Sequence, residues 1–517
     1  MRALIVTGTL ARQLVQDNVK QSHARAEVLS LPTQVAALMT PEYVSSRLSR
    51  MALQGFDLVM LPGMMRGDVS PVSRKIGIPA FKGPKHAADL PLVLDRLKEI
   101  KLSTVMPACE LMKDAIRRRA LRQLASINKK GVPAMVVGRG RRMLGIGGTA
   151  PMRVLAEIVD ASTMHEKTIA SWARYFADSM ADIVDIGMVV GGGHVKEAQR
   201  AVRAAKRAVS VPVSIDTNDV QEMRAAVRAR ADMILSINAA NMEQVARFAS
   251  RVPVVVTPAS NEKSWPKDAI RRVEQLEENL VQARKLGFRT LIADPVLSPI
   301  FMPSLIESLI AYRNFSQRHP QIPILCGVGN TIELMDGDSA GASLVLAGIA
   351  SEVRASILLV TEASDKTRGC VREMSTAAKM ATLAKARSSP PKDLGLDLLM
   401  LKEKRIKQEH YEASLEVGVP VVSEAKGQRF IYDPRGCFKM ALDRDAKQIV
   451  LYYYIYGESM PRLVIKGKDA LAISRAAIRR SLISRLDHAA YLGIELEKAD
   501  IALRTQKSYV QDQSIFS

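Results

Sequence analysis

The feature that most constrains the fold is a regular alternation of short apolar runs and helical stretches between residues 151 and 386. Eight apolar runs have the length and composition of buried strands, and each is followed by a helical pattern. The runs lie at 153–159, 182–187, 211–216, 232–238, 252–257, 290–294, 322–327 and 356–361. Eight strand–helix units in roughly 235 residues match the size of a (β/α)8 barrel. The sequence therefore predicts an α/β protein with a central TIM barrel over 151–386.

The first part of the chain, residues 1–150, has a less regular alternation that is typical of a small open α/β sheet. Apolar runs that resemble buried parallel strands alternate there with helical stretches. The predicted strands are "ALIVTG" (3–8), "FDLVMLPG" (56–63) and "VPAMVVG" (132–138), and the predicted helices are 41–54 and 90–100. This pattern predicts an N-terminal α/β domain.

The segment after the barrel begins with "RSSPPKDLGLD", a stretch rich in serine, proline and glycine that is typical of a linker. We assign 387–410 to this linker. Residues 411–517 then combine strand-like runs, "KQIVLYYYIYG" and "RLVIKG", with long amphipathic helical stretches. The sequence predicts a C-terminal α+β domain over 411–517.

Composition and charge narrow the class of protein. No apolar stretch approaches the ~20 residues that cross a bilayer, and the N-terminus lacks a signal-peptide pattern, so we expect a cytoplasmic protein without a membrane partner. Four scattered cysteines without a Cys-x-x-Cys pair argue against a disulfide framework or structural zinc. A net charge of +21 favours anionic partners in general. Aromatic residues make up only 4% of the chain, which makes a single-strand nucleic-acid binder unlikely.

Polar side chains end most of the predicted barrel strands. Because the carboxyl ends of parallel strands meet at one face of a barrel, these residues are expected to converge on one cup. They are Glu157 and Asp160 after the first strand, Asp185, Asp216, Asn238 and Asp294 at later strand ends, Asn330 after the seventh strand, and Lys366 and Arg368 after the eighth. For any single position, capping of the following helix is an alternative role, since Asp and Asn are favoured N-caps.

The chemistry of this set favours a flat ring that bears an amide and an amino group. A carboxylate accepts two N–H donors at once, and Asn both donates and accepts. A pterin presents such an edge. The sequence therefore predicts pterin contacts at Asp185, Asp216, Asn238, Asp294 and Asn330.

Four strand-end motifs, "ADIVDIG", "VPVSIDT", "DMILSIN" and "LIADP", resemble those of dihydropteroate synthase and the wider family of pterin-binding barrels. The resemblance covers about 151–386. It implies that Asp216, Asn238 and Asp294 hold the pterin. Over the whole chain, "FKGPKHAADLP", "TRGCVREMS" and "SRLDHAAYLGIELEKAD" resemble archaeal-type dihydropteroate synthase-related proteins associated with tetrahydromethanopterin.

This resemblance implies a transferase that joins a 6-hydroxymethyl-dihydropterin diphosphate to an arylamine, with loss of diphosphate. In the tetrahydromethanopterin pathway the arylamine would be a ribosylated aminobenzene phosphate. Lys366 and Arg368 are then candidate catalytic cations for the departing diphosphate, and Glu157 and Asp160 are candidate ligands of Mg²⁺. A homodimer is expected by the same resemblance.

Three motifs depart from the dihydropteroate synthase pattern. The first strand supplies Glu157 where an Asn is usual, the seventh has "ILCGVGNTIEL" in place of a Ser-Arg-Lys signature, and the eighth lacks an Arg-x-His pair. Glu157 and Asn330 also resemble residues of pterin-dependent corrinoid methyltransferases. Two alternatives therefore stay open: methyl transfer with a corrinoid partner, and a non-catalytic pterin-binding protein.

Overall fold

The computed structural model describes residues 1–97, 101–260, 265–402, 417–418, 420–422 and 431–516. The chain forms two compact units, Met1–Leu398 and Leu399–Ser517. The predicted linker and the start of the predicted C-terminal domain include residues 403–416, which lie outside the described residues. None of the helices in the described ranges is long and apolar enough to cross a membrane.

The N-terminal region of the first unit is a four-stranded parallel sheet in the order β2-β1-β3-β4, as an open α/β domain requires. Alternate residues of β1 face two separate apolar clusters: Ala3 and Ile5 pack with α1 and α4, and Leu4 and Val6 pack with α2 and α3. Helices therefore cover both faces of the sheet. The elements are β1 (Arg2–Thr7), α1 (Arg12–Val19), β2 (Arg25–Ser30), α2 (Pro41–Leu48), β3 (Leu58–Leu61), α3 (Ser70–Ile76), β4 (Ala80–Lys82), α4 (Leu90–Leu94), α5 (Ala108–Leu111) and α6 (Lys113–Lys130).

Both predicted helices of this region are shorter than expected. The pattern predicts a helix over 41–54, but α2 ends at Leu48. The pattern predicts a helix over 90–100, but α4 ends at Leu94, and residues 98–100 lie outside the described part of the chain. The carboxylate of Asp95 accepts hydrogen bonds from the Ser22 hydroxyl at 2.6 Å and the His23 backbone N–H at 2.8 Å. These contacts tie the chain at Asp95 to the loop after α1.

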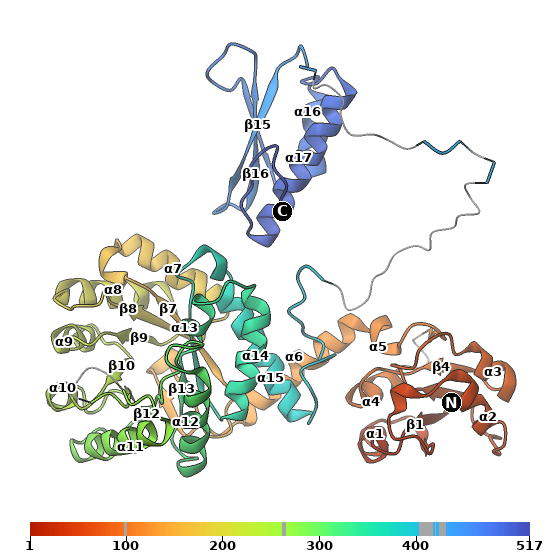
Figure 1. Cartoon of the computed structure of the whole chain (residues 1–517), viewed down its shortest axis with the longest axis horizontal. Helices are drawn as coiled ribbons and strands as arrows, with labels where there is room; N and C mark the ends of the chain where they lie inside the picture. The colour runs from red at the N-terminus through yellow and green to blue at the C-terminus, as the bar shows by residue number, and fades with distance from the viewer. Residues whose placement is uncertain (98–100, 261–264, 403–416, 419, 423–430, 517) are drawn as a thin grey trace. The chain divides into compact units, whose positions relative to one another are not determined.

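The central barrel has the eight predicted parallel strands, and helices surround them (Figure 1). The strands are β7 (Arg153–Ile158), β8 (Ile183–Gly187), β9 (Val213–Asp216), β10 (Met233–Ile237), β11 (Val254–Val256), β12 (Leu291–Ala293), β13 (Leu325–Cys326) and β14 (Ile357–Thr361). The helices are α7 (Glu166–Asp178), α8 (Val195–Ala208), α9 (Val220–Arg228), α10 (Met242–Ala249), α11 (Ala269–Lys285), α12 (Leu305–Arg318), α13 (Val328–Glu333), α14 (Ser339–Glu352) and α15 (Cys370–Ala386).

The barrel closes between its sixth and seventh strands. Seven ladders join the strands in the order β12-β11-β10-β9-β8-β7-β14-β13. A parallel bridge between Ala293 and Ile324 joins the two ends, and the Ala293 N–H donates to the Pro323 carbonyl at 2.9 Å. The predicted (β/α)8 fold is confirmed.

A hairpin fills the amino-terminal mouth of the barrel. The strands β5 (Met135–Val137) and β6 (Leu144–Ile146) are antiparallel. Val137 and Ile146 are fully buried and share an apolar cluster with Leu155, Ile183 and Ile357 from the inner side of the barrel. The prediction that 132–138 is a parallel strand of the N-terminal sheet was wrong. An apolar run of this length does not show which neighbour buries it.

We expect Val137→Ala to lower the free energy of unfolding by about 2 kcal/mol, because it removes buried methyl groups and leaves a cavity in a closed core. Chemical denaturation of the full chain measures the change. Val136→Ala on the same strand is the matched control, since Val136 is 41% exposed and should cost little. Equal losses for the two variants would contradict the role of the hairpin as a plug.

The second unit contains an antiparallel sheet of three strands in the order β15-β16-β17. Its elements are β15 (Cys437–Asp443), β16 (Gln448–Tyr454), β17 (Leu463–Gly467), α16 (Ala470–Arg479) and α17 (Leu486–Thr505). Phe438, Ile449 and Leu451 of the sheet pack with Ile473 and Leu496 of the two helices in one apolar cluster. The predicted α+β class of this region is confirmed.

Candidate functional site

The register of three adjacent strands brings Glu157, Asp185 and Asp216 together at the carboxyl end of the barrel. Glu157 pairs with Asp185, and Gly187 pairs with Asp216. Side chains alternate between the two faces of a strand. Leu155 and Ile183 belong to the cluster inside the barrel, so Glu157 and Asp185, two residues further along, face the inside as well. The acids thus form a polar layer above the apolar floor.

The three carboxylates lie very close to one another. Each offers an oxygen atom, and these atoms all lie within 4.8 Å of one another. Asp185 is fully buried, and one of its oxygens accepts a hydrogen bond from the Ser214 hydroxyl. Its other oxygen, Oδ2, is buried and has no hydrogen-bond partner among the described residues. Such an atom is costly unless a cation or an N–H donor meets it.

Gly187 makes room for this arrangement. A Cβ atom at position 187 would overlap the carboxylate of Glu157. Any other residue would therefore push Glu157 away from its two neighbours. The motif "DIG" thus has a steric reason to end in glycine.

Burial and mutual repulsion disfavour full ionisation of the cluster. Burial raises the pKa of Glu157 to about 8, and the charges of Asp216 and Asp160 add to the effect. Burial raises the pKa of Asp216 to about 6. The pKa of Asp185 lies well above its ordinary value because of burial and the charges of Asp216 and Glu157. A divalent cation, or N–H groups of a ligand, would stabilise the ionised forms.

Asp294, directly after β12, is held in place by a tyrosine from α12. Its Oδ1 accepts hydrogen bonds from the Tyr312 hydroxyl at 2.7 Å and from the Val296 N–H at 2.8 Å. Burial raises the pKa of Asp294 to about 6, and the charge of Asp216 contributes to that rise. Asp216 and Asp294 therefore lie within electrostatic reach of each other at the same end of the barrel.

Asn238 follows β10 and shapes the turn after it. Its side-chain oxygen accepts a hydrogen bond from the Ala240 N–H at 2.9 Å. Its backbone N–H donates to Asn241 Oδ1 at 3.0 Å. The side-chain NH₂ group of Asn238 is thus the part of the amide that the local turn does not use.

The predicted cations and Asn330 lie on the loops and the short helix after β13 and β14. Asn330 is exposed on α13. Lys366 forms an ion pair with Asp336 at 2.9 Å, and the charge of exposed Arg368 acts on Glu362. Across the described ranges, neither Lys366 nor Arg368 forms an ion pair with the three clustered carboxylates.

Glu333, at the end of α13, anchors the loop that carries these cations. It accepts hydrogen bonds from the hydroxyls of Ser364 and Thr367, both at 2.6 Å, and from the Ala363 N–H at 2.8 Å. The loop after β14 is therefore tied to the helix after β13. The sequence contains no pattern that singles out Glu333 for this role.

Asp160 lies beside the cluster but is not one of its three members. It is exposed and adopts a left-handed backbone conformation with φ 53°. Its charge raises the pKa of Glu157. The close group of oxygens instead joins Glu157 to Asp185 and Asp216.

Sequence reasoning missed Ser214 and Tyr312, which orient Asp185 and Asp294. Ser214 had a usable signal, because it precedes Asp216 by two residues and therefore faces the same side of β9. Tyr312 had none, since it comes from the middle of a helix 18 residues after Asp294.

Comparison with known proteins gives matches to family models in three parts of the chain. Residues 158–401 match the pterin binding enzyme family, residues 432–512 match the PterinBD-DUF4346 family, and residues 2–85 match a family of unknown function, DUF6513. The chain is 35% identical over 528 residues to an uncharacterized protein of Methanocaldococcus jannaschii. That match covers 100% of this chain and 99% of the relative.

Solved structures of dihydropteroate synthases are similar to about half of the chain. The Yersinia pestis enzyme with a pterine-sulfa conjugate is 16% identical to this chain, with a TM-score of 0.39. The match covers 49% of this chain and 100% of the chain of that enzyme. The Xanthomonas albilineans enzyme in complex with 7,8-dihydropteroate is 19% identical to this chain, also with a TM-score of 0.39. That match covers 48% of this chain and 98% of the chain of that enzyme.

The barrel and its family match define the class: a pterin-binding (β/α)8 barrel. The chain belongs to the same family as the Methanocaldococcus jannaschii protein, and its barrel matches the pterin binding enzyme family.

Proposed function

We propose that this protein is a transferase of the dihydropteroate synthase type. It joins the 6-hydroxymethyl group of a dihydropterin diphosphate to the nitrogen of an arylamine and releases diphosphate. The observation that carries the proposal is the set of acids at one end of the barrel, where Asp216 and Asp294 interact electrostatically beside Glu157 and Asp185.

Asp216 and Asp294 are the residues that would hold the pterin ring. An ionised carboxylate accepts two N–H bonds, which suits the amide and amino edge of a pterin. Both groups have a pKa of about 6, so both are mostly ionised at pH 7. Asn238 would add its NH₂ group as a donor to a ring carbonyl. Asp185 lies in the buried floor below the ring, and exposed Asn330 would contact the outer edge of the ring.

The chemical step is a displacement at the exposed methylene carbon. The amine nitrogen forms a C–N bond while the C–O bond to diphosphate breaks, its electron pair leaves with the diphosphate, and the amine proton is released. Lys366 and Arg368, in the loop before α15, would offset the growing negative charge. The ion pair of Lys366 with Asp336 does not prevent this role, because Asp336 is 99% exposed and is easily displaced.

The acidic cluster fits a magnesium ion. Mg²⁺ prefers oxygen ligands, Asp185 and Glu157 belong to one close group of carboxylates, and Oδ2 of Asp185 has no hydrogen-bond partner among the described residues. Glu157 and Asp185 would hold the ion, and Asp160 would add charge from the rim. Bound there, Mg²⁺ would neutralise part of the charge of the diphosphate.

The arylamine and the pathway follow from the whole-chain resemblance. We propose a phosphorylated, ribosylated aminobenzene as the arylamine and tetrahydromethanopterin biosynthesis as the pathway, with the chain acting as a homodimer. The net charge of +21 is consistent with two phosphorylated substrates.

The direct test uses the purified full chain with the pterin diphosphate, the arylamine and Mg²⁺, and it measures diphosphate release. We expect turnover that is lost in Asp216→Ala and in Asp294→Ala. No diphosphate release by the unaltered chain, or full activity in both variants, would refute the proposal.

Methyl transfer from a methyl-pterin to a corrinoid protein is the second candidate. The observation that favours it is the place of Glu157 within the acidic cluster. Methyl transfer requires no diphosphate site. Turnover of methyl-pterin with a corrinoid protein, without diphosphate release in the first assay, would select this reaction.

Pterin affinity should fall as the solution is acidified through pH 6. Asp216 and Asp294 both titrate at about 6 in the free protein, and each accepts N–H bonds better when ionised. We expect the pterin affinity to fall about tenfold for each of the two carboxylates between pH 7 and pH 5. Calorimetric titration with 6-hydroxymethylpterin at several pH values measures it. An affinity independent of pH over this range would contradict the proposed contacts.

A further inference from the structure

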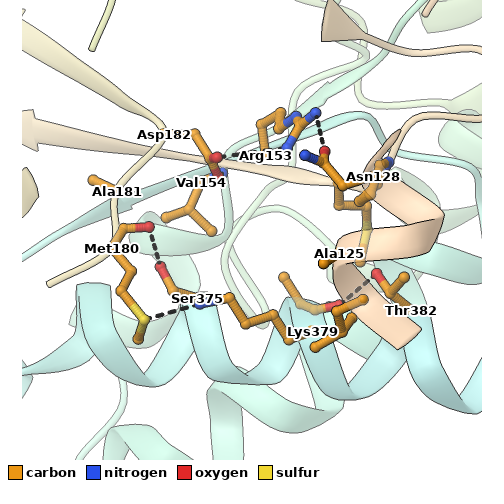
Figure 2. A pocket seen from close by; sticks show the side chains of 14 residues that line it. Ala125, Asn128, Arg153, Val154, Met180, Ala181, Asp182, Ser375, Lys379 and Thr382 are labelled. Carbon is orange, nitrogen blue, oxygen red and sulfur yellow. Dashed lines mark hydrogen bonds and ion pairs between the residues drawn. The ribbon is translucent and has the colours of Figure 1, made fainter. Parts of the chain in front are cut away.

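A cavity of about 410 Å³, whose lining side chains are drawn in Figure 2, lies at the end of the barrel opposite to the candidate site. Its walls come from α6, from the amino-terminal ends of β7 and β8, and from α15. Arg153 and Val154 begin β7, and Asp182 directly precedes β8, so these residues belong to the amino-terminal face. The cavity is therefore separate from the acidic cluster. Its size falls in the range of small-molecule pockets, ~300–1,000 Å³.

Much of the cavity wall is apolar, and several of its polar groups bond to each other. The apolar lining residues include Leu124, Ala125, Met152, Val154, Ala181 and Ala378. The hydroxyls of Ser375 and Thr382 donate to the carbonyls of Met180 and Ala378, at 2.9 and 2.8 Å. These two hydroxyls therefore have acceptors within the protein.

The two charges near the barrel strands also compensate each other. Asp182 accepts a hydrogen bond from the Val154 N–H at 2.9 Å and lies 3.7 Å from a guanidinium nitrogen of Arg153. Arg153 donates further to Asn128 at 2.8 Å and to the Gly145 carbonyl at 3.0 Å. This pair therefore contributes little net charge to the cavity.

Lys379 is the remaining charge in the cavity wall. Its ammonium group contacts the thioether sulfur of Met180 at 2.9 Å (Figure 2). A thioether is only a weak acceptor. Among the described residues Lys379 forms no ion pair within 4 Å, although the more distant charge of Asp182 acts on it. Burial lowers the pKa of Lys379, as expected for an ammonium group without a strong acceptor.

We propose that this cavity binds a small organic monoanion, a carboxylate with an apolar body, whose carboxylate pairs with Lys379. One ammonium group matches one carboxylate, and the apolar walls match an apolar body. A phosphate group is a poorer match, because a dianion needs more donors than one lysine provides. No step of the proposed transferase reaction uses this cavity.

Calorimetric titration of the full chain with benzoate tests the proposal. We expect saturable binding at one site, with an affinity about tenfold lower in Lys379→Gln, because a charged hydrogen bond is lost. Ala125→Phe should weaken binding to a similar degree, since this exposed residue of α6 lines the cavity and a larger side chain would fill it. It also tests the site if Lys379→Gln fails to fold.

Lys385→Gln is the matched control, because Lys385 lies on the same helix and is exposed. It should bind benzoate as the unaltered chain does. Asp216→Asn should also bind benzoate normally, so failure of this proposal and failure of the proposed transferase function are distinguishable. The absence of saturable benzoate binding, tighter binding of inorganic phosphate, or equal affinities in Lys379→Gln and Lys385→Gln would overturn the proposal.

Discussion

Asp216→Asn is expected to lower the affinity for 6-hydroxymethylpterin roughly 100-fold, because two charge-assisted hydrogen bonds to the ring are weakened at once. Asp216 is the carboxylate that interacts with both Glu157 and Asp294, so its loss affects the whole acidic group. Titration calorimetry or the fluorescence of the pterin measures the affinity. Asp294→Asn should have an effect of similar size.

The control for this prediction is Glu166→Gln, which removes an exposed carboxylate from the start of α7. It should leave pterin affinity unchanged. The same Asp216 variant should also bring the pKa of Glu157 down toward its ordinary value, since the charge of Asp216 helps to raise it. Pterin binding at full affinity in both Asn variants would mean that the ring is held elsewhere.

Arg272→Ala is expected to cost about 4 kcal/mol in the free energy of unfolding. Arg272 is fully buried, and it donates to the carbonyls of Pro266, Lys267 and Val296 and to the Ser308 hydroxyl, at 2.8 to 3.1 Å. Its removal takes the donor from one buried and three part-buried acceptors and empties the buried space of the side chain, at up to roughly 1–3 kcal/mol for each acceptor before relaxation. Chemical denaturation measures the loss.

The same substitution should weaken pterin binding in the fraction that folds, because Val296 belongs to the loop that positions Asp294. Arg271→Ala is the matched control, since Arg271 is the exposed neighbour on the same helix. A loss of stability shared equally by the two variants would show that helix propensity, and not the buried network, is the cause.

The barrel could be predicted from the sequence because its signal is local and repeated. Each of the eight predicted runs contains one strand of the barrel, such as β8 within 182–187 and β14 within 356–361. A parallel strand buried on both faces needs a nearly continuous apolar run, and this composition is visible without any knowledge of neighbours. The predicted closure of these strands into one barrel is confirmed by the bridge between Ala293 and Ile324.

The hairpin β5–β6 shows where local signals fail. Residues 132–138 have the composition of a buried strand, and they are buried. Their partner is an antiparallel strand, and their neighbours are the barrel interior and not the N-terminal sheet. Composition records that a segment is buried, but it does not record which surface covers it.

For the acidic residues, too, one part of the arrangement could be predicted from the sequence and another part could not. That Asp185 and Asp216 lie at strand ends on one face of the barrel follows from the position of each acid in its apolar run. A carboxylate oxygen of Glu157, and none of Asp160, lies within 4.8 Å of those of Asp185 and Asp216. This depends on the stagger between neighbouring strands and on the space left by Gly187. The side chains that orient the acids, Ser214 and Tyr312, come from other elements.

The sequence by itself determined the kind of barrel, the strand ends that carry acids and the family of the protein, because burial pattern and motif are properties of short segments. Only the tertiary structure decided which acids gather into one cluster, which hairpin fills the amino-terminal mouth of the barrel, and that Lys379 faces a cavity with a weak acceptor. These depend on distances between segments far apart along the chain, and such distances exist only once the strands have closed into a barrel.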